Sequence, residues 1–376
     1  MTDFAPSPPR ATESERLALR ETLRGEAAKL GFDVCGFTTA AAPATAQALV
    51  RWLAAGCHGS MTWLARSARR RINPQEVLPG ARSVVVVATS YAADADTGLP
   101  GPSVSGAPRP QVGDVARYAR YADYHQVLGR QLEALAAKVI ALGGPGTAAK
   151  WYVDTGPVLE RDLAQRAGVG FVGRHTNLVN PRLGNWLLLG EVLTTLELPP
   201  DTPATNRCGR CSRCLAACPT GALVAPFHLD ARRCLAYLTI EWKGPIPEAL
   251  RPALGARIFG CDICLAVCPW NRFGRIGHLL AGQARPDLAA PDLLAWLALD
   301  EATFRERLEG TPLARTGWRR LRRNVCVALG NVGGPSALTA LETVARGADA
   351  MLAEHAQWAI GQIQRRAAGR PSSSPR

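Results

Sequence analysis

The 376-residue chain carries a formal net charge of +13, and 47% of its residues are hydrophobic. These values exclude a wholly disordered protein and allow two or three domains. No apolar run approaches the ~20 residues of a membrane span, and the first residues lack the apolar core of a signal peptide. We therefore expect a cytoplasmic protein that does not bind membranes. The charge favours a polyanionic partner such as nucleic acid; an ordinary arginine-rich, soluble surface is the alternative.

The first two hundred residues alternate between helical and extended patterns. An amphipathic helix is predicted over 12–30, ended by Gly31, and FDVCGFT predicts a short strand. The valine-rich run at 83–91 is typical of a strand covered on both faces. A helix in DYHQVLGRQLEALAAKVIAL, a strand in AKWYVDT, a helix in PVLERDLAQRAG and a strand in NWLLLGEVLTTLEL follow. This alternation predicts an α/β domain over 14–200.

A proline-rich linker at 198–206 separates this domain from a cysteine-rich region, 201–280. From about residue 285 the pattern is purely helical, and its last segments resemble paired short helices at the spacing of helical repeats. We predict a HEAT-like repeat domain over 281–366 and a disordered tail over 367–376. The expected fold class is a multidomain α/β and α+β protein with an all-α C-terminal domain.

Seven of the eleven cysteines lie in two runs. RCGRCSRCLAACPT has the bacterial ferredoxin spacing, whereas GCDICLAVCPW has three cysteines and Ile258 at the fourth position. Cys234 is the nearby cysteine that can replace the missing ligand. In ferredoxins the last cysteine of each run reaches the other cluster. We therefore predict one 4Fe–4S cluster on Cys208, Cys211, Cys214 and Cys268, and a second on Cys218, Cys234, Cys261 and Cys264.

Two zinc sites with four cysteines each are the alternative, because zinc also binds cysteine pairs two residues apart. The interleaved runs ending in Cys-Pro favour iron and sulfur. The remaining cysteines, Cys35, Cys57 and Cys326, stand alone in apolar segments, and we expect them in the core. Two clusters form a path for electrons, and such a path needs an acceptor in another part of the chain.

GVGFVG at 168–173 matches a dinucleotide-binding fingerprint, but a helix precedes it and irregular sequence follows. We reject a Rossmann domain and expect backbone that allows close approach to a flat or bulky group. DYHQVLG at 123–129 resembles a cobalamin-binding signature, with its glycine one residue too late. His125 is therefore either a cofactor contact or a residue that merely starts a helix.

Asp154 ends an apolar strand and precedes the sequence Thr-Gly-Pro. Ligands of α/β proteins bind at the carboxyl ends of strands, and an aspartate beside apolar residues can have a raised pKa and act as an acid. The alternative is a helix cap, a position that aspartate favours.

Taken together, the runs HGSMTWL, PGARSVVVVATSY, VDTGPVLERDLAQRAGVGFVGRHTNLV and RRLRRNVCVALGN, with the cysteine pattern between them, resemble the epoxyqueuosine reductase family. The resemblance covers most of the chain. It implies reduction of epoxyqueuosine to queuosine at the wobble position of tRNA, with two 4Fe–4S clusters and cobalamin. The α/β domain would bind the corrinoid as reductive dehalogenases do, with no protein histidine on cobalt.

The resemblance implies Asp154 as the catalytic acid. It places Arg161, Gly173, Arg174, His175, Thr176 and Asn177 in the cofactor and substrate loop, and Arg174 stands where relatives are expected to have lysine. The implied partners are the tRNA anticodon stem-loop and an external electron donor, and we expect a monomer.

Two other functions compete with this one. A reductive dehalogenase-like enzyme for a small molecule would share the cofactors, but such enzymes usually carry a twin-arginine export signal, and Arg70-Arg71 lies too deep in the chain. A non-catalytic electron carrier would not need so large an α/β domain.

Between Gly310 and Asn324 the chain has five arginines and no acidic residue. A solvated helix face explains such a run, but we predict that they bind tRNA phosphates: Arg315, Arg319, Arg320, Arg322 and Arg323.

Overall fold

The computed structural model describes residues 12–92 and 111–369. At its centre lies a sheet in the order β1 (Val34–Thr39), β2 (Ser83–Ser90), β7 (Leu187–Thr194) and β4 (Ala149–Tyr152). All the predicted strands are present, but every neighbouring pair is antiparallel. The α/β interpretation is therefore wrong for this sheet, which is α+β. The valine-rich run correctly indicates a strand that is buried on both faces. Helices cover both faces of this antiparallel sheet, so the same pattern arises without parallel strands.

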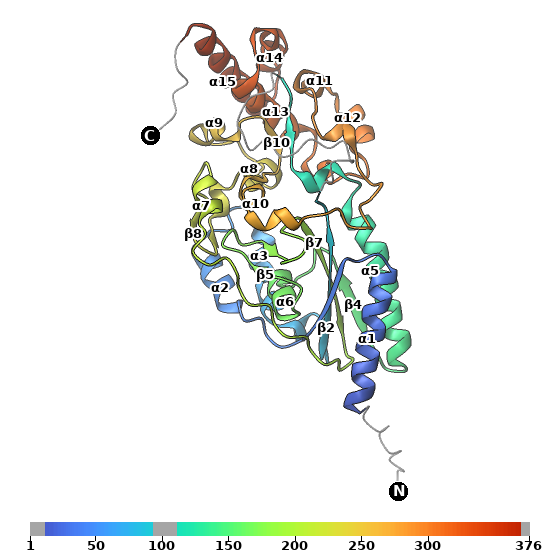
Figure 1. Cartoon of the computed structure of the whole chain (residues 1–376). Helices are drawn as coiled ribbons and strands as arrows, with labels where there is room; N and C mark the ends of the chain where they lie inside the picture. The colour runs from blue at the N-terminus through green and yellow to red at the C-terminus, as the bar shows by residue number, and fades with distance from the viewer. Residues whose placement is uncertain (1–11, 93–110, 370–376) are drawn as a thin grey trace.

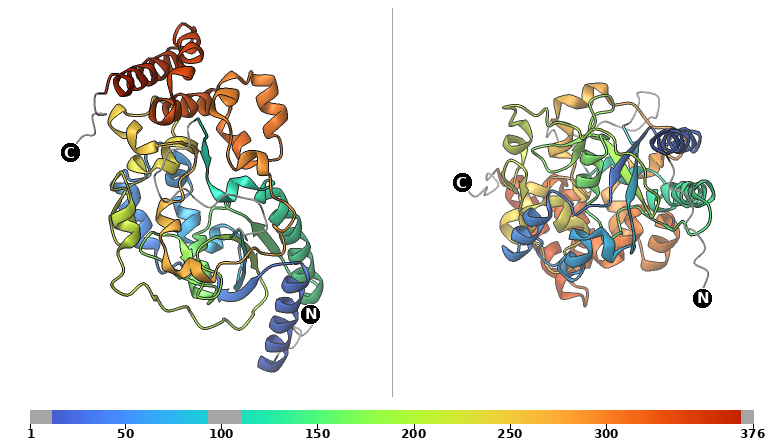
Figure 2. Two further views of the ribbon diagram at one scale, coloured as in Figure 1. Left: turned by 45° about the horizontal axis from the view of Figure 1, so that its top comes forward. Right: turned by 90° about the horizontal axis from the view of Figure 1, so that it is seen from below.

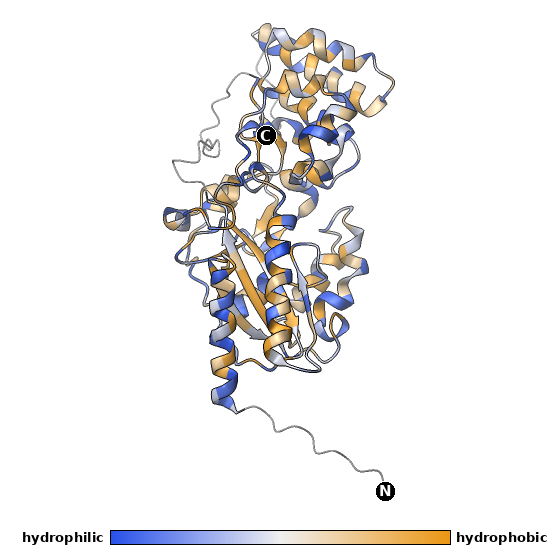
Figure 3. Cartoon of the chain, turned by 90° about the vertical axis from the view of Figure 1, so that its right-hand side faces the viewer, coloured by the Kyte–Doolittle hydropathy of each residue, from blue (hydrophilic) through white to orange (hydrophobic). Residues whose placement is uncertain are grey.

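Two long helices cover one face of the sheet (Figure 1). They are α1 (Glu13–Lys29) and α5 (Tyr124–Gly143), whose leucines share one apolar cluster with Val85, Val87 and Val192. α1 begins where the sequence predicts, because the Thr12 side chain and Glu15 cap each other's backbone amides. Figure 3 shows the strands coloured almost wholly hydrophobic between these amphipathic helices.

A short helix, α6 (Glu160–Arg166), covers the opposite face, where Leu163 and Ala164 pack against Val84, Val86 and Leu193. The sequence places the start of this helix at Pro157, but it begins three residues later with Leu159 as its N-cap. The glycine-rich run then enters a hairpin of β5 (Phe171–Val172) and β6 (Leu178–Val179). A hairpin in place of a second helix confirms that the run is not a Rossmann fingerprint.

The segment between β1 and β2 is helical, with α2 (Ala46–Ala54), α3 (Thr62–Arg66) and α4 (Ala68–Ile72). The cysteine-rich region has only short elements. They are α7 (Arg213–Ala217), β8 (Leu223–Ala225), β9 (His228–Leu229), α8 (Leu235–Ile240), α9 (Arg251–Leu254), β10 (Arg257–Phe259) and α10 (Ile263–Ala266). β8 pairs with β9, and β10 pairs with β3 (Asp114–Val115) from an earlier part of the chain.

The C-terminal helices gather at the end of the molecule opposite the N-terminus (Figures 1 and 2). They are α11 (Leu293–Ala298), α12 (Glu301–Leu308), α13 (Trp318–Val332), α14 (Leu338–Ala345) and α15 (Ala350–Ala367). α13 packs on α15, and one apolar cluster joins these helices to Leu235, Leu238 and Phe259 of the cysteine-rich region. The predicted boundary at 280 therefore crosses a shared core, and the domain limits stay a prediction.

Within the described ranges, no helix is both long and apolar enough to span a membrane. Cys57 and Cys326 are buried, and Cys35 packs partly buried against the sheet cluster, as expected of core cysteines. The predicted tail lies mostly outside the described residues, although Ala367 still belongs to α15.

Candidate active site and cysteine centres

Asp154 lies in the loop between β4 and α6, with a φ of 57°. The Tyr124 hydroxyl donates a 2.7 Å hydrogen bond to Asp154 Oδ2, and His125 Nε2 lies 3.4 Å from the same oxygen. Because α6 begins at Glu160 with Leu159 as its cap, Asp154 caps no helix there. The helix-cap alternative is therefore wrong, and the left-handed backbone at a non-glycine residue marks a strained position typical of functional loops.

His125 is the second residue of α5, and Asp123 caps this helix by accepting from the His125 amide. The His125 Nδ1 atom lies 2.7 Å from Asp123 Oδ1, and its Nε2 atom lies 2.7 Å from Arg315 Nη1. Burial acts to lower the pKa of His125, but hydrogen bonds with Asp123 and Asp154 outweigh it and raise the pKa. Both ring nitrogens are thus engaged, which fits both a helix-start residue and a residue of the site.

Arg315 belongs to a 3-10 turn at Pro312–Thr316, and its Nη1 atom also lies 3.9 Å from Asp154 Oδ2. Burial acts to raise the pKa of Asp154, but hydrogen bonds from His125 and Tyr124 and the charge of Arg315 outweigh it and lower the pKa. The expectation of a raised pKa is therefore wrong. It missed three polar partners that come from other parts of the chain, and Asp154 is ionised at neutral pH in this state.

A cavity of about 270 Å³ opens beside Asp154, between the end of the sheet, α6 and the cysteine-rich region. Its wall combines polar groups with a leucine-rich floor from β7. The lining residues that matter below are Tyr91, Tyr124, Glu160, Arg161, Asn177 and Asn185. The sequence predicted Arg161 and Asn177 near Asp154, and the structure places both in this cavity.

The loop 173–177 is a tight turn in which the Gly173 amide donates to the Asn177 carbonyl at 2.8 Å. Thr176 has a φ of 70°, and Arg161 Nη1 donates to its carbonyl at 2.7 Å. A Cβ at Gly173 would lie 2.8 Å from the His175 ring, so the turn needs glycine. Burial lowers the pKa of His175 to about 4, so its ring is neutral. Arg174 lines a different cavity, beside the cysteines.

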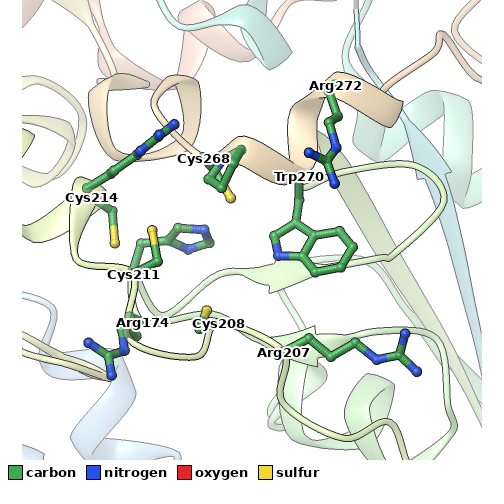
Figure 4. Close-up of a pocket in the computed structure, with 11 residues that line it drawn as sticks. Arg174, Arg207, Cys208, Cys211, Cys214, Cys268, Trp270 and Arg272 are labelled. Carbon is green, nitrogen blue, oxygen red and sulfur yellow. The ribbon is translucent and has the colours of Figure 1, made fainter.

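This second cavity, of about 210 Å³, is lined by Cys208, Cys211, Cys214 and Cys268 (Figure 4). Arg174, Arg207, Arg213 and Arg272 stand around it with Trp270. These four cysteines are the first predicted set, although they lie up to 60 positions apart in the chain. Burial, and then repulsion from the other three thiols, raises the pKa of Cys268 to about 11, which shows how close they lie.

The second predicted set also converges. Burial, then repulsion from Cys261, Cys234 and Cys218, raises the pKa of Cys264 well above its usual value. Burial raises the pKa of Cys234, and the nearby Cys218 adds to this rise. Burial likewise raises the pKa of Cys261, and the nearby Cys234 adds to it. Cys234 therefore lies near the three cysteines with which the sequence grouped it.

The cysteine centres and the Asp154 cavity are neighbours. Asn185 lines the Asp154 cavity, and its Nδ2 atom lies 3.2 Å from Nε2 of His175, which lines the Cys208 cavity. Tyr91 also lines the Asp154 cavity, and Cys264 contributes to the raised pKa of its hydroxyl, after burial as the main cause. Leu265, which follows Cys264 in the chain, also lines the Asp154 cavity, so neighbours of both cysteine sets lie in or against its wall.

The arginines of residues 315–323 are divided between surface and core. Arg319 is exposed and ion-pairs with Asp349, whereas Arg320 and Arg322 are half-buried and donate to the carbonyls of Ile240 and Leu297. Arg323 is fully buried, with bonds to carbonyls of the segment 238–244. The prediction that Arg323 binds tRNA is wrong, because it lies on the inner face of α13 beside Leu321 and Val325.

The comparisons with known proteins agree with this arrangement. A family described as "4Fe-4S double cluster binding domain" matches residues 207–271, and one described as "Epoxyqueuosine reductase QueG, DUF1730" matches residues 71–155. An epoxyqueuosine reductase of Xanthomonas campestris is 43% identical, over 90% of this chain and 95% of the relative. The chain belongs to the epoxyqueuosine reductase family. The resemblance seen in the sequence is confirmed.

Solved structures of this family have the same fold. A crystal structure of an epoxyqueuosine reductase with an epoxyqueuosine-modified tRNA-Tyr stem loop matches with a TM-score of 0.81 and 32% identity, covering 92% of this chain and 90% of that one. An epoxyqueuosine reductase from Bacillus subtilis, with its catalytic loop swung out of the active site, matches with a TM-score of 0.81 and 31% identity, covering 92% and 90% of the two chains. The cysteine region binds two 4Fe–4S clusters, so the zinc alternative is wrong.

Sequence reasoning missed several residues of this epoxyqueuosine reductase site. Tyr124 lies inside the DYHQVLG motif, but that motif directs attention to its neighbour His125. Glu191 is an acidic residue in the apolar run LLLGEVL, and that contrast is a signal the sequence offered. Nothing local marked Arg315 as a neighbour of Asp154, because the contact joins distant segments.

Proposed function

We propose that this chain reduces epoxyqueuosine to queuosine at the wobble position of tRNA. The carrying observation is a strained, hydrogen-bonded aspartate in a cavity beside two four-cysteine centres, in a member of the epoxyqueuosine reductase family. Opening the epoxide to an alkene and releasing its oxygen as water consumes two electrons and two protons. The two clusters supply the electrons singly, and an external donor of low potential refills them.

Cobalamin is the proposed acceptor of these electrons, and when bound it would supply a redox-active metal centre for reduction of the epoxide. A cavity of about 270 Å³ holds only the reacting part of so large a group, so the rest would lie along its open side. The residues proposed to hold it are Arg161, Gly173, Thr176 and Asn177, with Arg174 and His175 on the part of the loop that lines the cysteine cavity. A Cβ at Gly173 would meet the His175 ring, so glycine keeps this loop closely packed. His125 has both nitrogens engaged, which supports a cobalt without a histidine ligand.

Asp154 is the proposed proton donor to the departing oxygen. Its Oδ2 atom receives the Tyr124 hydroxyl and lies within reach of His125 and Arg315, so its orientation in the cavity is held from three directions. The relative from Bacillus subtilis has a catalytic loop that swings out of its active site. The loop at 153–159 is the corresponding candidate here, because it carries Asp154 and contains no helix or strand.

The arginines proposed to bind RNA are Arg315, Arg319, Arg320 and Arg322, of which Arg315 lies 3.9 Å from Asp154. Arginines here would hold the backbone of the anticodon stem-loop while the modified base enters the cavity. A relative bound to a modified tRNA stem loop supports this assignment. The HEAT-like nature of α11–α15, a corrinoid-binding role for the sheet domain, a monomeric state and a cytoplasmic location belong to the same proposal.

The test is anaerobic turnover of epoxyqueuosine-containing tRNA by the protein reconstituted with iron, sulfide and cobalamin. Wild-type protein should form queuosine only when a reductant is present. Asp154→Asn should retain both clusters and cobalamin absorbance but lose about 10²–10⁴-fold in rate, the usual cost of losing a general acid. Thr155→Ser, a mild change in the same loop, is the matched control. A near-wild-type rate for Asp154→Asn would remove Asp154 from the mechanism.

A further inference from the structure

Two glutamates with no role so far lie behind Asp154. Glu191 is in the middle of β7, paired with Val86 of β2 on one side and Tyr152 of β4 on the other. Side chains of paired residues point to the same face, and Val86 faces α6, so Glu191 faces α6 as well. Glu160 is the first residue of α6 and lines the Asp154 cavity. The sequence therefore places two carboxyl groups between the sheet and α6, next to the site.

Neither carboxyl group has the full set of partners that an ionised carboxylate needs. Glu191 is 0% exposed, and among residues 12–92 and 111–369 neither of its oxygens has a hydrogen-bond partner. Glu160 Oε1 is also buried without a partner in that part of the chain, although the Glu160 carboxyl has a hydrogen bond with the Asp154 backbone. An isolated buried carboxylate costs several kcal/mol, and such a group takes up a proton instead. Both side chains are thus built to be neutral acids.

The charges around the pair act in the same direction. Burial, then the charge of Asp154, raises the pKa of Glu160 to about 7, although Arg161 and Arg71 oppose this. Burial, then Glu160 and Asp154, raises the pKa of Glu191 well above its usual value. Asp154 itself is ionised at neutral pH, because Tyr124, His125 and Arg315 lower its pKa. The group assigned as proton donor therefore lacks a proton, while burial and the neighbouring charges favour the protonated forms of Glu160 and Glu191.

We propose that Glu160 and Glu191 form a proton reserve for the Asp154 site, from which Glu160 delivers a proton into the cavity as the epoxide oxygen leaves. This inference rests on the proposed function. In the step, one proton leaves the Glu160 carboxyl, Asp154 passes one to the departing oxygen, and no electron moves. Asp154 holds the proton only in passing, because it is the stronger acid.

After the transfer Glu191 keeps its proton and Glu160 carries a negative charge, which the nearby charges of Arg161 and Arg71 favour. Water refills Glu160 through the cavity after the reaction. A reserve suits this reaction, since the reduction consumes two protons at the cavity. Glu160 and Glu191 are positioning residues here, since they act through Asp154.

The first test is infrared spectroscopy of the protein with and without cobalamin at neutral pH. A protonated carboxyl group has a C=O stretch that ionised carboxylates lack, so wild-type protein should show a buried protonated-carboxyl band. Glu191→Gln should remove its contribution, whereas Thr194→Val, a buried change on the same strand, should leave it intact. Absence of the band in wild-type protein, or a band unchanged in Glu191→Gln, would overturn the proposal.

The second test is the pH dependence of single-turnover reduction of epoxyqueuosine-tRNA. The wild-type rate should fall as pH rises through about 7, where Glu160 loses its proton. Glu160→Gln should be at least ~10-fold slower at neutral pH and should lack this fall. Wild-type rates and pH profile in both glutamine variants would refute the reserve. If wild-type protein forms no queuosine at all, the proposed function fails, and the infrared result still decides whether the pair is protonated.

Discussion

Replacing the buried Arg323 with methionine tests whether this side chain stabilises the fold instead of binding tRNA. The guanidinium donates to the carbonyls of Trp242 at 2.8 Å, Gly244 at 2.6 Å and Leu238 at 2.7 Å, and to the Asn324 side chain. These bonds hold α13 against α8 and the segment that follows α8. Cys234 is the N-cap residue of α8. Methionine has a similar length but donates nothing, so it leaves one buried and two partly buried carbonyls unpaired.

Each unpaired buried carbonyl costs about 1–3 kcal/mol. Part of this cost is offset because the variant no longer buries a charge, which itself costs several kcal/mol. Burial lowers the pKa of Arg323 to about 9, so the side chain is still charged at neutral pH. We expect a net loss of about 3 kcal/mol in the free energy of unfolding, which is large for one substitution.

Thermal unfolding followed by circular dichroism, together with iron content, measures this effect. Arg323→Met should unfold several degrees lower than wild type and lose iron first from the cluster that Cys234 holds. Arg319→Met is the matched control, because its exposed ion pair with Asp349 contributes about 0–1 kcal/mol. Equal stability of the two variants would refute the structural role of Arg323. A loss of tRNA affinity without a loss of stability in Arg323→Met would restore the original prediction that it binds phosphate.

Three further outcomes are expected. Cys234→Ala should reduce iron after anaerobic reconstitution from about eight to about four atoms per chain, and full iron content would contradict its assignment as a ligand. Arg319→Glu should weaken tRNA binding and lower its salt dependence by about one unit of log–log slope per lost phosphate contact, with unchanged affinity returning Arg319 to an ordinary surface role. Burial lowers the pKa of His355 from 6.5 to about 4. Between pH 6.5 and pH 4, His355 is therefore protonated in the unfolded chain but neutral in the folded chain. The difference in melting temperature between wild type and His355→Gln should therefore be constant above pH 6.5 and shrink towards pH 4.

The convergence of the two cysteine sets could be predicted because the spacing encodes it, whereas the ligand role of each cysteine stays a prediction. Cys-x-x-Cys runs ending in Cys-Pro specify interleaved cubes, and only Cys234 was available for the missing position. The start of α1 was equally clear, because a capping box is a local signal. Such features depend on residues close together in the chain, so the sequence carries them directly.

The direction of the strands was not predictable in this way. The run at 83–91 shows that both faces of the strand are buried, but burial on both faces is compatible with parallel and antiparallel neighbours alike. The connection between β1 and β2 returns the chain in the opposite direction, and this depends on packing that no local pattern records.

The pKa of Asp154 and the fates of Arg315 and Arg323 were decided by tertiary structure alone. The sequence marked Asp154 as a candidate but could not show that Arg315, 190 residues away from His125, lies against both. Helical spacing placed Arg319 and Arg323 near one another, yet one is exposed and the other fully buried. A periodic pattern gives the relative directions of side chains on a helix, whereas the element that covers each face comes from distant parts of the chain. The charge, burial and pKa of a site residue depend on those distant neighbours, and for this reason they first become visible in the folded structure.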